Sequence, residues 1–272
     1  MTSKGPVGPA RIPRSSAATA YERRVAPFAR PFACAAVVGA SGLVLSSVID
    51  HGAGTGLVSR LVQAQHPLTH VYVLDPSAPL LAGVGNGPYT TPLVGTALDL
   101  DRLAPGLVAD FVVSNLALMF CPDPVADLVA LRGHTRPGGA LAISVLGGAP
   151  GVEPFHRYWS AVGAVVDDAW APERYPHHRF ATAESLRHVA EQAGWTNVTV
   201  SAVSGARRLG ASFAWEWLNG VLPVGVGAGY IELSASARRA VECQFSSVWG
   251  GIRTVTSAGW VLKGRNPGPC GS

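Results

Sequence analysis

The chain has 272 residues, of which 48% are hydrophobic and 14% are charged, so it can bury a large core and is not an intrinsically disordered chain. Six of its 21 basic residues lie in residues 1–30, where Glu22 is the one acidic residue, and the remaining body carries 15 basic and 16 acidic residues. A body that is nearly neutral argues against a large phosphate-binding face, so we expect no nucleic-acid partner.

Residues 1–18 are rich in Pro, Gly, Arg and Ser, and we expect a disordered tail there, followed by a single domain over 19–272. A helical stretch interrupted by Pro27 and Pro31 is expected at 19–40.

Strand-like and helix-like segments alternate along the rest of the chain. Apolar segments typical of strands lie at 45–50, 70–75, 91–97, 109–115, 139–147, 196–203 and 254–264. Segments with helical spacing lie at 56–65, 78–84, 123–135 and 182–194. This alternation predicts a mostly parallel sheet of seven strands with helices on both faces.

Two late segments, near 147–180 and 211–250, interrupt the alternation. Ligands of open α/β sheets bind beyond the carboxyl ends of the strands, so we expect these insertions to form a helical lid or substrate wall. Their aromatic residues could line an apolar or aromatic substrate, or could pack as ordinary core. The candidates for the wall are Trp159, Phe213, Trp215 and Trp217.

The stretch VIDHGAGTG at 48–56 places three glycines directly after an apolar strand. It is either a flexible turn or a cradle in which the missing side chains let a ligand approach the backbone. Asp75 ends the next strand, 25 residues beyond Asp50. An acid at that position can accept hydrogen bonds from both hydroxyls of a ribose, although it could instead cap the following helix. Glycine loop and acid together predict an adenosine-containing ligand.

The glycine loop lacks the lysine and the spacing of phosphate-binding loops, and its acidic start suits an ammonium group better than a pyrophosphate. At this point the sequence resembles the class I S-adenosylmethionine-dependent methyltransferases, which have a Rossmann-like fold. The segments that carry the resemblance, in order, are VIDHGAGTG, VYVLDPS, LVGTALDL, ADFVVSNLALMFCPDP and LRGHTRPGGALAISVLG. It covers about residues 20–205 and is similar in particular to malonyl-carrier-protein and small-molecule methyltransferases.

The resemblance implies S-adenosyl-L-methionine as the cofactor and assigns its contacts. Asp50, Gly52 and Gly54 would hold the methionyl part, and Asp75 the ribose. The residues that would border the adenine are Pro76, Ser77, Ala97 and Leu98. Asn115 and Leu116 would lie beside the sulfonium.

Two positions depart from the family's pattern. Residue 51 is His where an aliphatic residue is usual, and it could point into the core or into the methionine pocket. Residue 96 is Thr where an Asp commonly binds the adenine amino group. Asp99 is a candidate replacement, with a solvated loop acid as the alternative reading.

Methyl transfer is an in-line displacement that depends on alignment, and a base is required only if the nucleophile carries a proton. His156 is the preferred base because EPFHRYW follows the fifth strand, although a surface or structural role is the alternative. His177 and His178 compete with it as bases, and Tyr21 and Tyr158 are candidate donors that would orient the substrate.

We therefore expect methylation of a small molecule, a secondary metabolite, on oxygen rather than on carbon or nitrogen. One alternative is a cyclase or pericyclase that binds the cofactor without transferring methyl, and another is a non-catalytic binding module. The sequence leaves open whether the protein forms a homodimer.

Cys34, Cys121, Cys243 and Cys270 form neither a disulfide framework nor a metal motif, so we expect reduced thiols, no metal and a cytoplasmic protein. Arg23 and Arg24, followed by an uncharged run, imitate an export signal, but cleavage there would damage the strand that leads into the glycine loop. No membrane association is expected.

Overall fold

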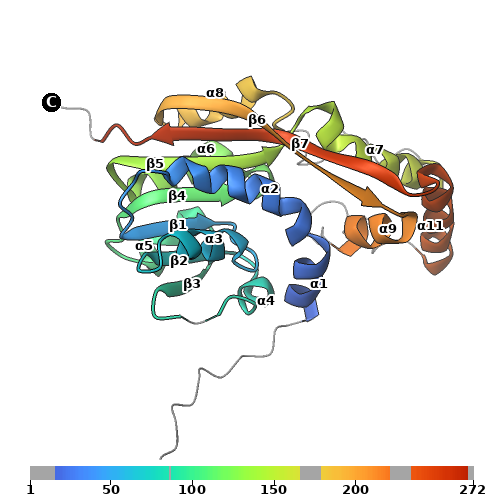
Figure 1. Cartoon of the computed structure of the whole chain (residues 1–272), viewed down its shortest axis with the longest axis horizontal. Helices are drawn as coiled ribbons and strands as arrows, with labels where there is room; N and C mark the ends of the chain where they lie inside the picture. Colours follow the sequence, from blue (N-terminus) through green and yellow to red (C-terminus); the bar gives the residue numbers. More distant parts are fainter. Residues whose placement is uncertain (1–15, 86, 166–178, 221–233, 269–272) are drawn as a thin grey trace, which may run out of the picture.

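The computed structural model describes residues 16–85, 87–165, 179–220 and 234–268. Its strands are β1 Ser47–His51, β2 His70–Asp75, β3 Thr90–Val94, β4 Ala109–Asn115, β5 Thr135–Leu146, β6 Thr196–Leu209 and β7 Arg253–Arg265. They form a seven-stranded sheet in the order β3-β2-β1-β4-β5-β7-β6 (Figure 1). The first five pair in parallel, whereas β7 runs antiparallel to both β5 and β6. The predicted seven-stranded, mostly parallel sheet is confirmed.

Helices cover both faces of this sheet, as expected. The described α-helices are α1 Ser16–Arg24, α2 Ala26–Val37, α3 Leu57–Gln65, α4 Ala78–Leu81, α5 Leu100–Leu103, α6 Pro124–Gly133, α7 Gly148–Gly163, α8 Ala183–Gln192, α9 Ala211–Gly220 and α11 Ala235–Trp249. On one face α2 and α3 pack on strand residues such as Val48 and Phe111. On the other face α6 and α8 pack on residues such as Ile49 and Val112. Alternate strand residues thus serve opposite cores, as the pleat requires.

A third apolar cluster, the helical cluster, joins α7, α9 and α11 to Phe28 of α2. Tyr158, Phe245 and Trp249 are fully buried within it. These helices lie in the two segments expected to interrupt the alternation, and Figure 1 shows them around the extended ends of β6 and β7, beyond the parallel strands. Residues 166–178 and 221–233 of those segments fall outside the described residues.

The amino-terminal helices differ from their predicted limits. Helix α1 begins at Ser16, and the break falls at Val25, whereas we expected interruptions at Pro27 and Pro31. Pro27 lies in the first turn of α2, where no intrahelical N–H bond is needed. Pro31 sits inside α2 without ending it. The buried apolar face of α2 compensates for the one hydrogen bond that this proline removes.

Strand β6 also extends past its predicted end at 203. It pairs with β7 as far as Leu209 opposite Arg253, and this long hairpin leads into α9. The pairing partner, which lies about fifty residues away in sequence, determines this length, so local pattern could not reveal it. Within the described residues, every helix is either too short or too polar to cross a lipid bilayer.

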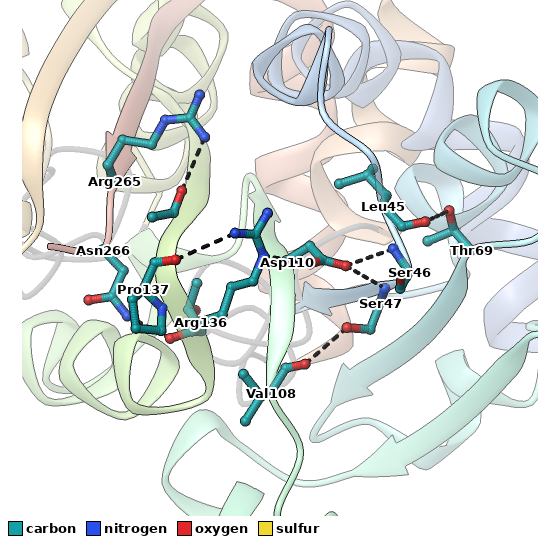
Figure 2. Close-up of polar contacts among 12 residues, drawn as sticks. Leu45, Ser46, Ser47, Thr69, Val108, Asp110, Arg136, Pro137, Arg265 and Asn266 are labelled. Carbon is teal, nitrogen blue, oxygen red and sulfur yellow. Dashed lines mark hydrogen bonds and ion pairs between the residues drawn. The ribbon is translucent and has the colours of Figure 1, made fainter. Parts of the chain in front are cut away.

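Polar contacts fix the end of the sheet at which β1 begins (Figure 2). One carboxylate oxygen of Asp110, on β4, accepts hydrogen bonds from the backbone N–H groups of Ser46 (2.6 Å) and Ser47 (3.0 Å). Its other oxygen accepts from Nε of Arg136 at 2.6 Å. This carboxylate therefore ties the start of β1 to β4 and β5, at the far end of β1 from the glycine loop.

Candidate functional site

The glycine loop joins β1 to α3 through backbone conformations that favour glycine. Gly52, Gly54 and Gly56 have φ of 66°, 57° and 79°, all in the left-handed region. The N–H groups of Gly52 and Ala53 donate to the carbonyl oxygen of Leu74, which fixes the loop against the end of β2. A Cβ atom on Gly52 would lie 2.1 Å from Cβ of Ala117, so no side chain fits there. Hydrogen bonds and the close approach of Ala117 thus define the conformation of the loop, and the cradle for a ligand stays a prediction.

Asp75 ends β2 beside this loop and is 7% exposed. One carboxylate oxygen accepts from the N–H of Gly54 at 2.7 Å, and the other from the N–H of Ser77 at 2.8 Å. A carboxylate offers about four acceptor positions, so two remain for a ligand's hydroxyls. The structure thus brings the glycine loop and the strand-end acid together, as the sequence predicts.

Asp50 lies at the base of the loop and is 1% exposed. Its Oδ2 atom accepts from both the N–H (2.9 Å) and the hydroxyl (2.6 Å) of Ser59 in α3. Its Oδ1 atom is buried and has no hydrogen-bond partner in the described part of the chain. Burial raises the pKa of Asp50 to about 6, although the Ser59 bonds oppose the shift. A buried acceptor without a partner is the atom that a cationic ligand would satisfy.

Helix α1 lies across the glycine loop. A Cβ atom on Gly54 would be in ordinary contact with the Tyr21 ring, 3.5 Å from Cζ and 3.6 Å from the hydroxyl oxygen. Glu22 accepts from the Thr55 hydroxyl (2.5 Å) and from Arg60 (2.7 Å), which holds α1 on the loop. Burial, with the nearby Asp75, Glu22 and Asp50 carboxylates, raises the pKa of Tyr21 well above its usual range. Tyr21 is therefore a neutral hydroxyl at physiological pH.

The residues expected at the adenine lie around the ends of β2 and β3. Pro76 and Leu98 are exposed, Ser77 is half-buried and Ala97 is buried. These four extend from the acid of β2 to the short 3₁₀ helix Ala97–Asp99.

Asp99, the candidate replacement for an adenine-binding acid, caps that 3₁₀ helix. Its carboxylate accepts from the N–H and the hydroxyl of Thr96 at 2.9 and 3.0 Å, and also pairs with Arg102. The Thr96 and Arg102 bonds lower the pKa of Asp99 to about 2. The Asp99 carboxylate thus has a local structural role, and the Thr96 hydroxyl donates its hydrogen bond to this carboxylate.

Asn115 ends β4 and Leu116 follows it, next to the glycine loop. Oδ1 of Asn115 accepts from the Ser144 hydroxyl at 2.6 Å. Leu116 has a φ of 56°, which is rare for a residue other than glycine. Such backbone strain persists only where surrounding contacts enforce it, and it clusters at ligand sites.

His51 points away from α3, into the face of the sheet covered by α6. Its Nδ1 atom lies 3.1 Å from the Ser114 hydroxyl of the adjacent strand, and its Nε2 atom 3.6 Å from Asp127 of α6. Of the two directions left open by the sequence, the structure therefore favours the core. Asp127 and Ser114 were not singled out from the sequence, because no spacing links residues on three separate elements.

Among the candidate bases, His156 lies exposed on α7, between residues that are buried in the helical cluster. Tyr158, an expected orienting donor, is fully buried there. His177 and His178 lie outside the described residues. The role of His156 as a base therefore stays a prediction.

The expected aromatic wall divides into two groups. Trp217 is 5% exposed and stacks on Phe28 at 4.1 Å between ring centroids, as core residues do. Phe213 and Trp215 are half-buried and remain candidates for contact with a substrate. For Trp159 the structure describes the backbone alone.

Comparison with known proteins places these features in a family context. A family model described as "Methyltransferase domain" matches residues 19–200. The trans-aconitate 2-methyltransferase of Deinococcus radiodurans is 35% identical over 100 residues, 37% of this chain and 38% of the relative. The malonyl-[acyl-carrier protein] O-methyltransferase of Pseudescherichia vulneris is 32% identical over 142 residues, 52% of this chain and 51% of the relative. The chain thus spans about two fifths to half of the length of these curated relatives.

Solved structures extend the likeness at the level of fold. A proposed methyltransferase from an antibiotic biosynthesis pathway of Anabaena variabilis matches with a TM-score of 0.55 and 16% identity, covering 89% of this chain and 98% of that one. A plantazolicin methyltransferase in complex with S-adenosylhomocysteine matches with a TM-score of 0.50 and 14% identity, covering 91% of this chain and 88% of that one.

Proposed function

The chain belongs to the methyltransferase-domain family, and from that premise we propose that it is an S-adenosylmethionine-dependent methyltransferase of a small molecule. One observation carries the proposal: the buried Oδ1 atom of Asp50, without a partner in the described residues, lies at the base of a glycine loop beside Asp75. A ligand with an ammonium group and a ribose satisfies both acids. The Tyr21 ring lies over Gly54, so that a single Cβ atom there would already be in van der Waals contact with it.

The residues of the chain have distinct binding roles in this proposal. Asp50 and the backbone of Gly52 and Gly54 hold the methionyl part, and Asp75 binds the ribose hydroxyls. Pro76, Ser77, Ala97 and Leu98 border the adenine, while Asn115 and Leu116 lie beside the sulfonium.

The bound cofactor supplies an activated methyl group, so the chain has to bind, align and desolvate more than it has to activate. Tyr21 closes the loop with a neutral hydroxyl that can orient a substrate oxygen. His156 accepts the proton of that oxygen. Phe213 and Trp215 offer an apolar wall for the substrate, which we take to be a secondary metabolite.

We favour oxygen as the atom that accepts the methyl group. The similar protein of Pseudescherichia vulneris, an O-methyltransferase, supports this choice. We place the protein in the cytoplasm because Cys34, Cys121 and Cys243 are free thiols. A cyclase that binds the same cofactor remains the alternative, and the two differ in product. Methyl transfer releases S-adenosylhomocysteine, whereas cyclisation does not.

The cofactor assignment is tested by calorimetric titration of S-adenosylmethionine and S-adenosylhomocysteine. Asp75→Ala removes the acceptor of both ribose hydroxyls, which costs roughly 1.5–3 kcal/mol for charge-assisted bonds, or about 10- to 150-fold in affinity. Asp101→Ala is the matched control, because that carboxyl is exposed on α5. Equal affinity of the wild type and Asp75→Ala, with both folded by thermal melting, would refute the assignment.

A further inference from the structure

Three side chains with metal-binding atoms meet beneath the glycine loop, on the α6 side of the sheet. They are His51 at the end of β1, Cys121 after the 3₁₀ helix Leu118–Phe120, and Asp127 in α6. His51 and Asp127 have side chains that are 5% and 6% exposed, and Cys121 is half-buried. One ligand atom from each lies within 4.8 Å of the other two. Imidazole, thiol and carboxylate are thus gathered in a largely dry space.

The imidazole and the carboxylate are too far apart for a good hydrogen bond, and the Cys121 thiol makes only weak sulfur contacts, with His51, Asp127 and the carbonyl oxygen of Ala117. Nε2 of His51 lies 3.6 Å from Oδ2 of Asp127 and 4.0 Å from Sγ of Cys121. An N–H···O hydrogen bond is normally about 2.7–3.2 Å long. Ligand atoms around a tetrahedral zinc ion are about 3.3–3.6 Å apart, given bonds of about 2.0–2.3 Å. Nε2 of His51 and Oδ2 of Asp127 are already at that spacing, and Sγ of Cys121 would have to approach Nε2 by about half an ångström.

The orientation of the imidazole also fits metal binding. Nδ1 of His51 lies 3.1 Å from the hydroxyl of Ser114, its neighbour across the β1–β4 pairing. When Nδ1 donates its proton to that hydroxyl, the lone pair of Nε2 faces Cys121 and Asp127. Histidines that bind metals are commonly oriented by such a bond from the other ring nitrogen.

We propose that His51, Cys121 and Asp127 bind one divalent cation of the zinc class. A mixed S, N and O set suits zinc better than magnesium or calcium, which prefer oxygen ligands alone. On binding, the Cys121 thiol forms a sulfur–metal bond and releases its proton to solvent. Thiolate and carboxylate then neutralise the charge of the ion, and water takes the fourth position.

Arg179 is the positive group that opposes the ion. Its guanidinium donates to the carbonyl oxygen of Cys121, at the exposed side of the cluster. The two anionic ligands outweigh this single charge. The bound ion would clamp β1 to α6 and to the segment after β4, directly below Gly52 and Ala117, which are already in contact range. Its role is therefore to stiffen the base of the loop, separately from cofactor binding.

The proposal is tested by cobalt titration of metal-free protein, because thiolate ligation to Co²⁺ gives a charge-transfer absorption band. The protein used is the variant Cys34→Ser/Cys243→Ser/Cys270→Ser, in which Cys121 is the remaining cysteine. Cys34 and Cys243 are exposed, so their replacement leaves the cluster intact. We expect the band to saturate at one equivalent of cobalt and to disappear when zinc is added.

Further variants separate a three-ligand site from adventitious binding to the thiol. His51→Gln and Asp127→Asn in the same background should each weaken cobalt binding by at least tenfold, with folding checked by circular dichroism. Adding Cys121→Ser should abolish the band. The proposal is wrong if the three-serine variant gives no band at one equivalent, or if His51→Gln and Asp127→Asn bind cobalt as tightly as their parent. Neither the supporting nor the contradicting result depends on a measurement of methyltransferase activity.

Discussion

Asp50 and Asp75 lie at the carboxyl ends of adjacent strands, yet their surroundings differ. Asp75 has a backbone N–H on each oxygen, whereas Asp50 has both Ser59 donors on one oxygen and none described on the other. Burial therefore raises the pKa of Asp50 to about 6. The free protein carries an energetic cost at this residue, and a cationic ligand would relieve it.

The first prediction follows from the sign of that shift. Because the folded pKa of Asp50 lies above the unfolded value of about 4, the folded state holds the proton more tightly. Ionised Asp50 therefore costs stability as pH rises from about 4 to about 6, and the cost persists above pH 6. Asp50→Asn should raise the free energy of unfolding at pH 7.5 by about 1–3 kcal/mol. Urea denaturation from pH 4 to 8 measures this.

The same substitution should weaken cofactor binding, because an amide does not pair with an ammonium group. For the wild type, affinity should increase as pH rises through about 6, and for Asp50→Asn it should stay flat. A less stable Asp50→Asn protein, or a variant that binds cofactor with wild-type affinity, would contradict this account of the residue.

The second prediction concerns His156, which is exposed on α7. A positioned base contributes about 10²–10⁴-fold to turnover, so His156→Ala should lower the rate by that order while cofactor affinity stays unchanged. Turnover on the true substrate across pH 6 to 9 is the measurement. His188→Ala, an exposed histidine on α8, is the matched control. A wild-type rate for His156→Ala would leave His177, His178 or alignment alone as the explanation.

At the scale of elements, two charged side chains of α1 attach this helix to neighbouring parts of the protein. Glu22 binds Thr55 and Arg60 of the glycine loop and α3, and Arg24 pairs with Glu216 of α9 at 3.0 Å. Because Tyr21 directly precedes Glu22 in the same helix, these contacts determine how its ring sits over Gly54.

The third prediction tests this attachment. Glu22→Ala should weaken cofactor binding by about two- to tenfold, because α1 and Tyr21 lose their hold on the loop. The melting temperature should change little, since partly exposed ion pairs contribute about 0–1 kcal/mol. Glu216→Ala is the control, as it frees α1 from α9 without touching the loop. Equal effects of the two variants on cofactor affinity would show that α1 acts as a whole and that the Glu22 contact has no special role.

The sheet and the glycine loop could be predicted from sequence because their signals are local. Apolar strands, intervening helices and the spacing from Asp50 to Asp75 lie within short windows. The limits of α1 and α2 could not, because the buried face of α2 overrides the effect of Pro31. The extension of β6 depends on its pairing with β7.

The site shows the same division at the level of single side chains. Asp75 beside Gly54 was predictable, since both belong to one strand–loop–helix–strand unit. The Glu22 contact with Arg60 spans 38 residues, and the Cys121 contact with His51 spans 70. No sequence pattern connects residues at such separations, and only the fold brings them together. Ser59 was equally hidden, because a serine in the first turn of a helix is common.

At the scale of the whole molecule, the two ends of β1 differ in how well their polar groups are satisfied. At its carboxyl end lie left-handed glycines, the strained Leu116 and the buried Asp50. At its amino end Asp110 has donors on both oxygens, from Ser46, Ser47 and Arg136. The first end is costly for the free protein and the second is well satisfied, which is the arrangement expected when a stable scaffold supports a ligand site.

The last prediction tests the stabilising end. Burial alone would raise the pKa of Asp110, but the bonds from Ser47, Ser46 and Arg136 outweigh it and hold the pKa below its usual range. Its folded pKa is thus below the unfolded value of about 4, so Asp110 stabilises the fold above that pH and loses its effect as pH falls through the folded pKa. Asp110→Asn leaves two N–H donors and a guanidinium poorly paired, and should lower the free energy of unfolding at pH 7 by about 1–3 kcal/mol.

The difference between wild type and Asp110→Asn should shrink as pH falls from about 5 to below 4, because both proteins then have an uncharged side chain there. Urea denaturation at several pH values measures it, and Glu242→Gln on the exposed side of α11 is the control, for which we expect no such convergence. Cofactor affinity should be unchanged in Asp110→Asn, since the residue lies at the opposite end of the sheet from the glycine loop. A constant difference at all pH values would mean that shape, and not the charge of Asp110, stabilises this end. A large loss of cofactor affinity would instead show that the two ends of the sheet are coupled.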